Sequence, residues 1–239
     1  ILLIFFFFFV IFIYYYYIRE EDYESELQVS IDDPTPTKSQ VTSLVFFITA
    51  MGLFMIQILT GAVTGHYTIS GSDFYGIDIG NIFPYAVLRT WHIQLSIMWI
   101  ATCFIGAGIF IGPFVSGREP RKQWLLSTGL FAALVVVVIG TLAGTWSSIQ
   151  GMLGEYSFLV GHQGYEYIEL GRLWQLMLIA GMIFWLLLVT RAILPALKEE
   201  EDKGGLTHML LYSTIAIPLF YMASLMYGQE SHLSDAEYW

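Results

Sequence analysis

Long apolar segments joined by short polar ones account for most of this chain. A helix needs about 20 predominantly apolar residues to cross the roughly 30 Å hydrocarbon core of a bilayer. The segments that reach this length are Ile1–Ile18, Ser43–Gly65, Tyr85–Val115, Trp124–Gly144, Leu173–Leu197 and Leu206–Tyr227. The pattern therefore predicts an all-α membrane protein with about six transmembrane helices.

Each end of the sequence is expected to continue into a longer protein. The chain begins without a methionine, inside a predicted membrane helix, so residues 1–18 are interpreted as a partial or N-terminal transmembrane helix. Residues 19–42 are interpreted as an acidic cytoplasmic linker, and residues 43–239 as the first part of a helix bundle that is incomplete at its C-terminus. In the third span, Gly106, Gly108 and Gly112 would permit close contact between helices.

Composition supports this class of protein and excludes others. Of the 239 residues, 56% are hydrophobic and 13% are charged, and the mean hydropathy of +0.64 excludes a single soluble domain of this size. The net charge of -10 argues against nucleic-acid binding. The single cysteine, Cys103, lies in an apolar segment, so neither a disulfide framework nor a paired-cysteine metal site is expected.

The positively charged residues indicate the orientation in the membrane. One set of loops holds Arg19, Lys38, Arg118, Arg121, Lys122, Arg191, Lys198 and Lys203. The opposite set holds Arg89 and Arg172. Because cytoplasmic loops carry the excess of lysine and arginine, the first set is predicted to face the cytoplasm. His66, His92 and Glu166 then lie at or near the outer face.

His92 is the leading candidate for chemistry. It stands eight residues after Pro84, about 12 Å into a helix that rises 1.5 Å per residue, where an ionisable side chain is costly and needs a partner. Imidazole on a membrane helix is a natural axial ligand of haem iron, and Arg89, one turn nearer the surface, could pair with a haem propionate. The alternatives are a histidine that hydrogen-bonds another helix and an arginine that extends to the interface.

Two other groups of polar residues lie on the predicted outer side. Glu166 and Glu169 would share one face of a helical turn, an arrangement that suits a Ca²⁺ ion or a proton path. The alternative is a solvated acidic rim. His66 begins a segment to Pro84 that is interpreted as an ordered outer loop. With an aromatic ring His66 could hold a quinone headgroup, and otherwise it is an interfacial cap on the second span.

Several motifs, in order and at similar spacing, resemble one family. They are the segment Arg89–Thr102, the motif Gly117-Arg118-Glu119-Pro120, the segment Gly161–Tyr167, and Ser231–Ser234 followed by Glu237-Tyr238-Trp239. From about Ser43 to Trp239 the chain resembles the quinol-dependent nitric oxide reductases, members of the haem-copper oxidase superfamily. The resemblance implies a respiratory-chain enzyme of denitrification in the cytoplasmic (inner) membrane of a bacterium or archaeon, with the reaction 2 NO + 2 e⁻ + 2 H⁺ → N₂O + H₂O.

The resemblance also implies roles for individual residues. His92 would be an axial ligand of the low-spin haem b, with Arg89 at a propionate. Glu166 matches a carboxylate that binds Ca²⁺, and Glu169 matches one in the outer-side proton path. The family's ligands for the high-spin haem b and the non-haem iron come after the position of Trp239. We therefore expect no catalytic iron ligand in this segment, and the remaining catalytic bundle in a continuing or separate chain.

One position departs from the family pattern. Quinol-using members resemble His-x-x-x-Glu-x-x-x-Phe at this place; His66 and Phe74 match, but Ser70 replaces the glutamate. This degenerate quinol site puts quinol in doubt as the electron donor and leaves open a nitric oxide dismutase-like enzyme, which converts 2 NO to N₂ and O₂ without external electrons. A non-catalytic cytochrome b-type relay subunit and a transporter-like bundle without haem are further alternatives.

Overall fold

The computed structural model describes residues 35–72, 76–162, 170–198 and 205–230, with side chains up to residue 223. The chain divides into two units, Ile1–Pro36 and Thr37–Trp239. In the first unit only Thr35 and Pro36 are described, and they form no regular element. The predicted first span therefore lies outside the described residues, as do Phe74, Glu166, Glu169 and the segment Ser231–Trp239.

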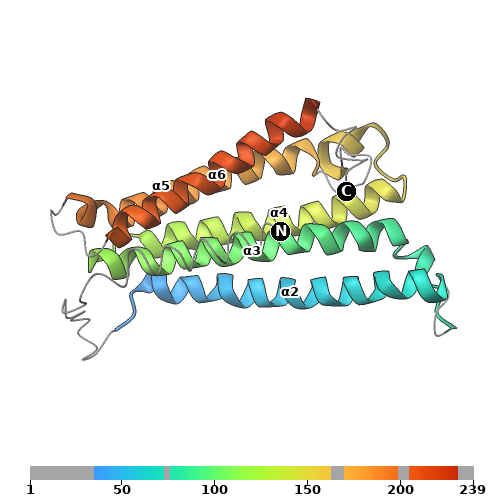
Figure 1. Ribbon diagram of the computed structural model, residues 1–239, viewed down its shortest axis with the longest axis horizontal. Coiled ribbons are helices and arrows are strands. Elements are labelled where there is room, and N and C mark those ends of the chain that lie inside the picture. Colours follow the sequence, from blue (N-terminus) through green and yellow to red (C-terminus); the bar gives the residue numbers. More distant parts are fainter. Residues whose placement is uncertain (1–34, 73–75, 163–169, 199–204, 231–239) are drawn as a thin grey trace, which may run out of the picture. The chain divides into compact units, whose positions relative to one another are not determined.

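Long helices dominate the second unit (Figure 1). They are α2 (Lys38–Ser70), α3 (Tyr85–Ser116), α4 (Gln123–Ile149), α5 (Arg172–Lys198) and α6 (Leu206–Glu230). Within the described residues these five helices are long and apolar enough to cross a membrane, and no β-strand is present there. The prediction of an all-α, multi-pass membrane protein is confirmed, and each of the last five predicted spans coincides with one helix.

Helix α2 extends beyond the apolar segment Ser43–Gly65 at both ends, because polar residues and a glycine determine where it begins and ends. Thr37 caps the first turn: its hydroxyl accepts from the Gln40 amide, and the Gln40 side chain accepts from the Thr37 amide. The helix ends at Ser70, because Gly71 adopts a positive φ of 74° that other residues rarely take. The prediction that an outer loop begins at His66 is therefore wrong, since His66 lies within the helix.

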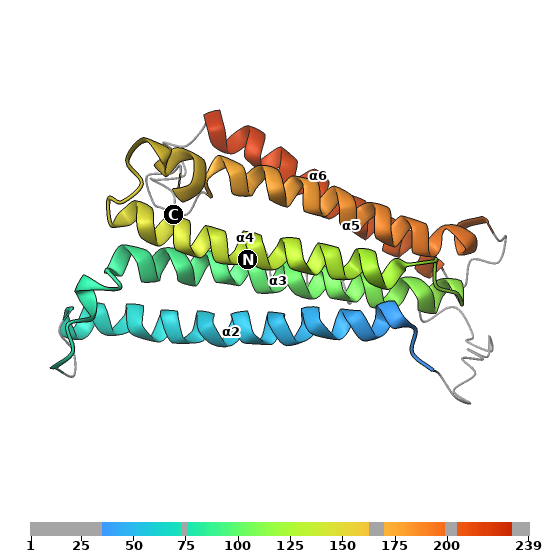
Figure 2. The same ribbon diagram turned by 180° about the vertical axis from the view of Figure 1, so that it is seen from behind.

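Helix α3 contacts every other long helix of the described bundle. Helix α2 packs along it on one side, and α5, with α6 beside it, packs on the other, as both views show (Figures 1 and 2). The buried core lies between α2, α3, α4 and α5 and includes Phe46, Leu95, Ile109, Leu134 and Leu188. Large apolar residues elsewhere face outward; Ile48 on α2, for example, is 71% exposed, as expected for a surface in contact with lipid.

Glycines bring the backbones of these helices close together. A Cβ atom on Gly106 would lie 2.9 Å from Cβ of Phe46 on α2, and one on Gly112 would lie 2.8 Å from Cβ of Ala192 on α5. Gly108 faces Trp185 of α5 in the same way. The predicted close contacts of α3 are therefore confirmed, and they involve two different neighbours.

The ends of the helices that carry the predicted cytoplasmic charges lie together. The Glu119 carboxylate, in the loop after α3, accepts from the backbone amides of Lys38 and Ser39, each at 3.0 Å. This caps the first turn of α2 with a negative charge, which the helix dipole favours. Nη2 of Arg191 on α5 donates to the Arg121 carbonyl at 2.7 Å. Glu119 of the Gly117–Pro120 motif thus joins the start of α2 to the end of α3.

Candidate functional site

The imidazole of His92 is held by the backbone of α2. His92 is half-buried, two turns into α3, and its Nδ1 lies 2.8 Å from the carbonyl oxygen of Gln57. A carbonyl oxygen can only accept a hydrogen bond, so Nδ1 must carry the proton in this contact. The contact therefore fixes the tautomer of the neutral ring and leaves the lone pair on Nε2.

The second ring nitrogen of His92 has the character of a metal ligand. In the part of the chain that the structure describes, Nε2 takes part in no hydrogen bond. Histidines that bind metals almost always donate their other ring N–H to a carboxylate, a carbonyl or water, because this orients the ring and raises its basicity. The donor set therefore fits an axial haem ligand that binds iron through Nε2.

A glycine makes room for the ring on α2. A Cβ atom on Gly61 would lie 2.6 Å from Cε1 and 2.7 Å from Nδ1 of His92, closer than side-chain atoms pack. By contrast, a Cβ on Gly65, one turn further along the same helix, would meet nothing within 4 Å. The imidazole thus occupies space that any other residue at position 61 would fill.

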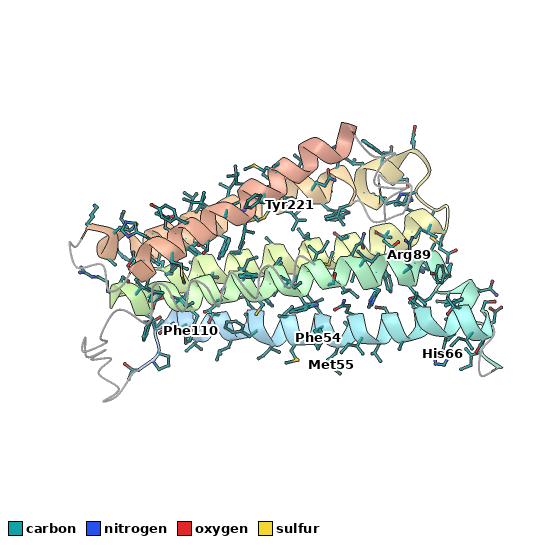
Figure 3. All side chains as sticks on the ribbon, viewed as in Figure 1. Phe54, Met55, His66, Arg89, Phe110 and Tyr221 are labelled. Carbon is teal, nitrogen blue, oxygen red and sulfur yellow. The ribbon has the colours of Figure 1, made fainter. Side chains whose placement is uncertain are left out.

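The turn of α2 that holds His92 has a second anchor on α3. The Gln57 side chain accepts from the indole N–H of Trp99 at 2.8 Å, and Trp99 meets the Phe54 ring edge-to-face at 5.2 Å between ring centroids. The hydroxyl of Thr60 also donates to the Gln57 carbonyl, at 2.9 Å. Figure 3 shows Phe54 on the side of α2 that faces α3 and Met55 on the opposite side. Gln57 therefore accepts hydrogen bonds from two side chains of α3, His92 and Trp99.

Arg89 lies where the sequence predicts. It is half-buried in α3, three residues before His92 and hence on a neighbouring part of the same helical face. Figure 3 places Arg89 at the same end of the helices as His66 of α2. A guanidinium one turn from His92, towards the polar end of its helix, fits the charge of a haem propionate.

The three residues of the degenerate quinol site are only partly described. His66 is half-buried and Ser70 is exposed, and both lie in the last turns of α2, four residues apart on one face. Phe74 lies outside the described residues. The structure thus brings His66 and Ser70 together at the end of α2 and does not test the third member.

The segment that carries Glu166 and Glu169 starts and ends at one place. His162 and Leu170, which flank it, form an antiparallel bridge, and the Gly171 amide donates to the Gly161 carbonyl at 3.1 Å. Before it lie two short elements, η4 (Gly154–Tyr156) and the π-helical turn η5 (Ser157–Gly161). The carboxylates themselves lie outside the described residues.

The side chain of Trp174 holds η5 against the end of α4 and the start of α5. The indole N–H of Trp174 donates to the Val160 carbonyl at 2.7 Å. Gly140 and Gly144 of α4 leave room for this anchor, since a Cβ on Gly140 would collide with the Trp174 ring and one on Gly144 with the Val160 carbonyl. The segment that leads to Glu166 and Glu169 therefore begins with a packed turn of the backbone.

Three residues of the site escaped the sequence analysis: Gln57, Gly61 and Trp99. The signals for them were an amide side chain inside an apolar span and a small residue four positions later, which are typical of helix–helix contacts in membranes. No group of three or more His, Cys, Asp or Glu side chains comes together among the described residues. The site is thus a single imidazole with its supporting turn, and the described part of the chain offers no multi-ligand metal centre.

Comparison with known proteins places the chain in a family. The family model for cytochrome c and quinol oxidase polypeptide I matches residues 41–238, which include all five described helices apart from the first turn of α2. The chain therefore belongs to this family of haem-copper oxidases.

One curated relative gives a narrower similarity. The chain is 22% identical over 205 residues to a nitric oxide reductase subunit from Stutzerimonas stutzeri. The match covers 84% of this chain and 40% of the relative, so the chain spans about two fifths of that protein's length. The chain is thus a membrane protein of an oxidoreductase family, and its sequence is similar to that relative.

Proposed function

We propose that this chain is the first part of a nitric oxide reductase-like enzyme, in which it supplies one axial ligand of the low-spin haem b. His92 would hold the haem iron through Nε2, and Arg89 would neutralise a propionate. The enzyme reduces nitric oxide: 2 NO + 2 e⁻ + 2 H⁺ → N₂O + H₂O. The high-spin haem b and the non-haem iron belong to the part of the enzyme that this chain does not span.

The observation that carries this proposal is the arrangement of the His92 imidazole. Its Nδ1–H donates a hydrogen bond to the Gln57 carbonyl, and its Nε2 lone pair remains for a metal. The bound haem b would accept and pass on single electrons. The chain's own part is to hold the ring in one tautomer and one orientation, and to place a positive charge one turn away.

We also propose roles for two carboxylates and an orientation in the membrane. Glu166 as a Ca²⁺ ligand and Glu169 as a proton carrier rest on the resemblance and on the chemistry of carboxylates. We place the protein in the cytoplasmic membrane of a bacterium or archaeon, with the loop after α3 inside. The orientation is inferred from the cations at one end of the bundle, where Arg191 contacts the Arg121 carbonyl.

One observation favours a second activity. Ser70 lies exposed on the face of α2 that His66 shares, at the place where the quinol-using reductases carry a glutamate. A serine hydroxyl does not take up a quinol proton at neutral pH, so electron entry from quinol is impaired. A dismutase, which converts 2 NO to N₂ and O₂, needs no donor and would tolerate this change.

The first experiment tests the ligand. In the complete enzyme, His92→Ala should abolish the low-spin b-type band in the reduced-minus-oxidised spectrum, and it should lower the haem content per protein. The matched control is His208→Ala, which removes a histidine from another membrane helix, α6, where its ring lies tilted against that of Tyr212. A low-spin band that survives His92→Ala would contradict the proposed role.

The second experiment separates the two reactions. Nitrogen-15-labelled NO is given to the purified enzyme with and without an artificial electron donor. Labelled N₂O formed only with the donor identifies a reductase, whereas labelled N₂ formed together with unlabelled O₂ in the absence of the donor identifies a dismutase. If the enzyme is a reductase impaired in quinol use, Ser70→Glu should raise its activity with quinol and leave its activity with the artificial donor unchanged.

A further inference from the structure

The Gln57 carbonyl is accessible to His92 because residue 61 has no side chain. In an α-helix the Cα–Cβ bond tilts towards the N-terminus, so a residue covers the surface over the preceding turn. Position 61 is therefore the position whose side chain would cover the carbonyl of residue 57. Because residue 61 is glycine, that carbonyl is exposed on the face of α2 that meets α3, and Nδ1 of His92 reaches it at 2.8 Å.

The glycines of α2 differ sharply in what surrounds them. The three nearest atoms to a Cβ built on Gly61 all belong to the His92 ring, at 2.6, 2.7 and 3.4 Å. A Cβ built on Gly52 or Gly65 has no neighbour within 4 Å. Gly61 and Gly65 form one Gly-x-x-x-Gly pair, a pattern of close helix approach, yet only the first of them has a neighbour at this range. The tight contact at Gly61 is thus specific to the imidazole.

We propose that Gly61 is a positioning residue for the haem ligand: its lack of a side chain lets the Nδ1–H of His92 donate a hydrogen bond to the Gln57 carbonyl and leaves Nε2 available to the haem iron. This inference rests on the proposed role of His92. It goes further in assigning the orientation and basicity of the ligand to a residue on a different helix.

The hydrogen bond has a predictable effect on the haem. A carbonyl that accepts a hydrogen bond from Nδ1–H makes Nε2 more basic, and a more basic ligand favours the ferric state. A methyl group at position 61 displaces the ring and lengthens or breaks this bond. The ferric state then loses part of its advantage, so the midpoint potential of the low-spin haem rises.

The test compares Gly61→Ala with Gly65→Ala in the complete, haem-containing enzyme. Both changes add the same methyl group to the same helix and bring the same gain in helix propensity, but only the first one meets His92. Outer-shell partners of metal-binding histidines typically contribute 10–100-fold to affinity or activity. We expect Gly61→Ala to shift the ferric–ferrous equilibrium about tenfold towards the ferrous haem, about 59 mV for one electron. Gly65→Ala should match the unmodified enzyme.

A double-mutant cycle adds a measurement that does not depend on the haem. Relative to Gly65→Ala, the methyl group at position 61 should lower the unfolding temperature when His92 is present. In the His92→Ala background this difference should vanish, because the atoms in the way are gone.

The outcomes separate this inference from the proposed function. If His92→Ala keeps the low-spin band, the proposed function fails. If His92→Ala abolishes the band while Gly61→Ala equals Gly65→Ala in midpoint potential and in the cycle, the role of Gly61 fails and the role of His92 stands. A raised midpoint potential in Gly61→Ala, together with an unfolding-temperature difference that vanishes in the His92→Ala background, supports both roles.

Discussion

Helix α3 makes two glycine-dependent contacts that differ in chemistry. On the α2 side, Gly61 admits the imidazole of His92, and the contact ends in hydrogen bonds to Gln57. On the α5 side, Gly108 admits Trp185 and Val189, at 3.0 and 3.1 Å from a built Cβ. The first contact positions a reactive ring, and the second fills space. A small residue in a membrane helix is therefore informative only when the group it admits is known.

Two tryptophans illustrate the same difference. The indole N–H of Trp99, at the α2 contact, donates to the Gln57 side chain at 2.8 Å. The indole N–H of Trp185, at the α5 contact, is buried and has no hydrogen-bond partner among the described residues. Because an unpaired buried donor costs free energy, the α5 contact must derive its stability from packing, while the α2 contact combines packing with directed polar bonds.

The largest stability effect is expected at the packing contact. Gly108→Leu inserts a side chain where Trp185 and Val189 already lie, and overpacking of this kind costs about 1–3 kcal/mol or more. The unfolding temperature in detergent should fall, whereas the position of the low-spin haem band should not change. The control is Gly129→Leu on α4, where a Cβ meets nothing within 4 Å. The comparison breaks down if Gly108→Leu removes the haem band and leaves stability unaltered.

A smaller loss is expected at the inner end of the α2–α3 pair. Glu119→Ala removes both hydrogen bonds to the first amides of α2, and loss of such a cap costs about 0.5–2 kcal/mol. Glu155→Ala, at an exposed position of η4, should have no measurable effect on unfolding. Equal unfolding temperatures for the two variants would show that the cap contributes nothing.

The smallest effect is expected from Trp99→Phe. This change removes the hydrogen bond to the Gln57 side chain but keeps an aromatic ring beside Phe54. Hydrogen bonds between membrane helices contribute on average about 0.6 kcal/mol, so the unfolding temperature should fall slightly and the haem band should persist. Trp124→Phe, at a residue that is 41% exposed, provides the reference. A loss of haem in Trp99→Phe alone would mean that the side chain of Gln57, and not its carbonyl, governs His92.

The helices were predictable because hydropathy and length decide membrane insertion. The exact ends were not, because they depend on a capping box at Thr37 and on the positive φ of Gly71, which follow the local backbone and not the apolar pattern. For α2 this moved His66 from an expected loop into the helix. The family match also confirmed the superfamily that the segment Arg89–Thr102 and the other motifs had indicated.

The candidate site was predictable only in part. His92 stood out because an imidazole is rare within a membrane span. Its partner did not, because a backbone carbonyl leaves no trace in the sequence. Gly61 carried the same pattern as Gly65, and only the three-dimensional arrangement distinguishes the two. The roles of Arg89, Glu166 and Glu169 remain predictions that rest on chemistry and resemblance.

The cap at Glu119 has a consequence far from the loop in which it lies. By binding the first amides of α2, it fixes how far α2 can slide along its neighbour. Gln57 is 19 residues beyond Lys38, about 28 Å along the axis at 1.5 Å per residue. The register at which Gln57 meets the His92 imidazole is thus set in part by a carboxylate at the opposite end of the helix pair.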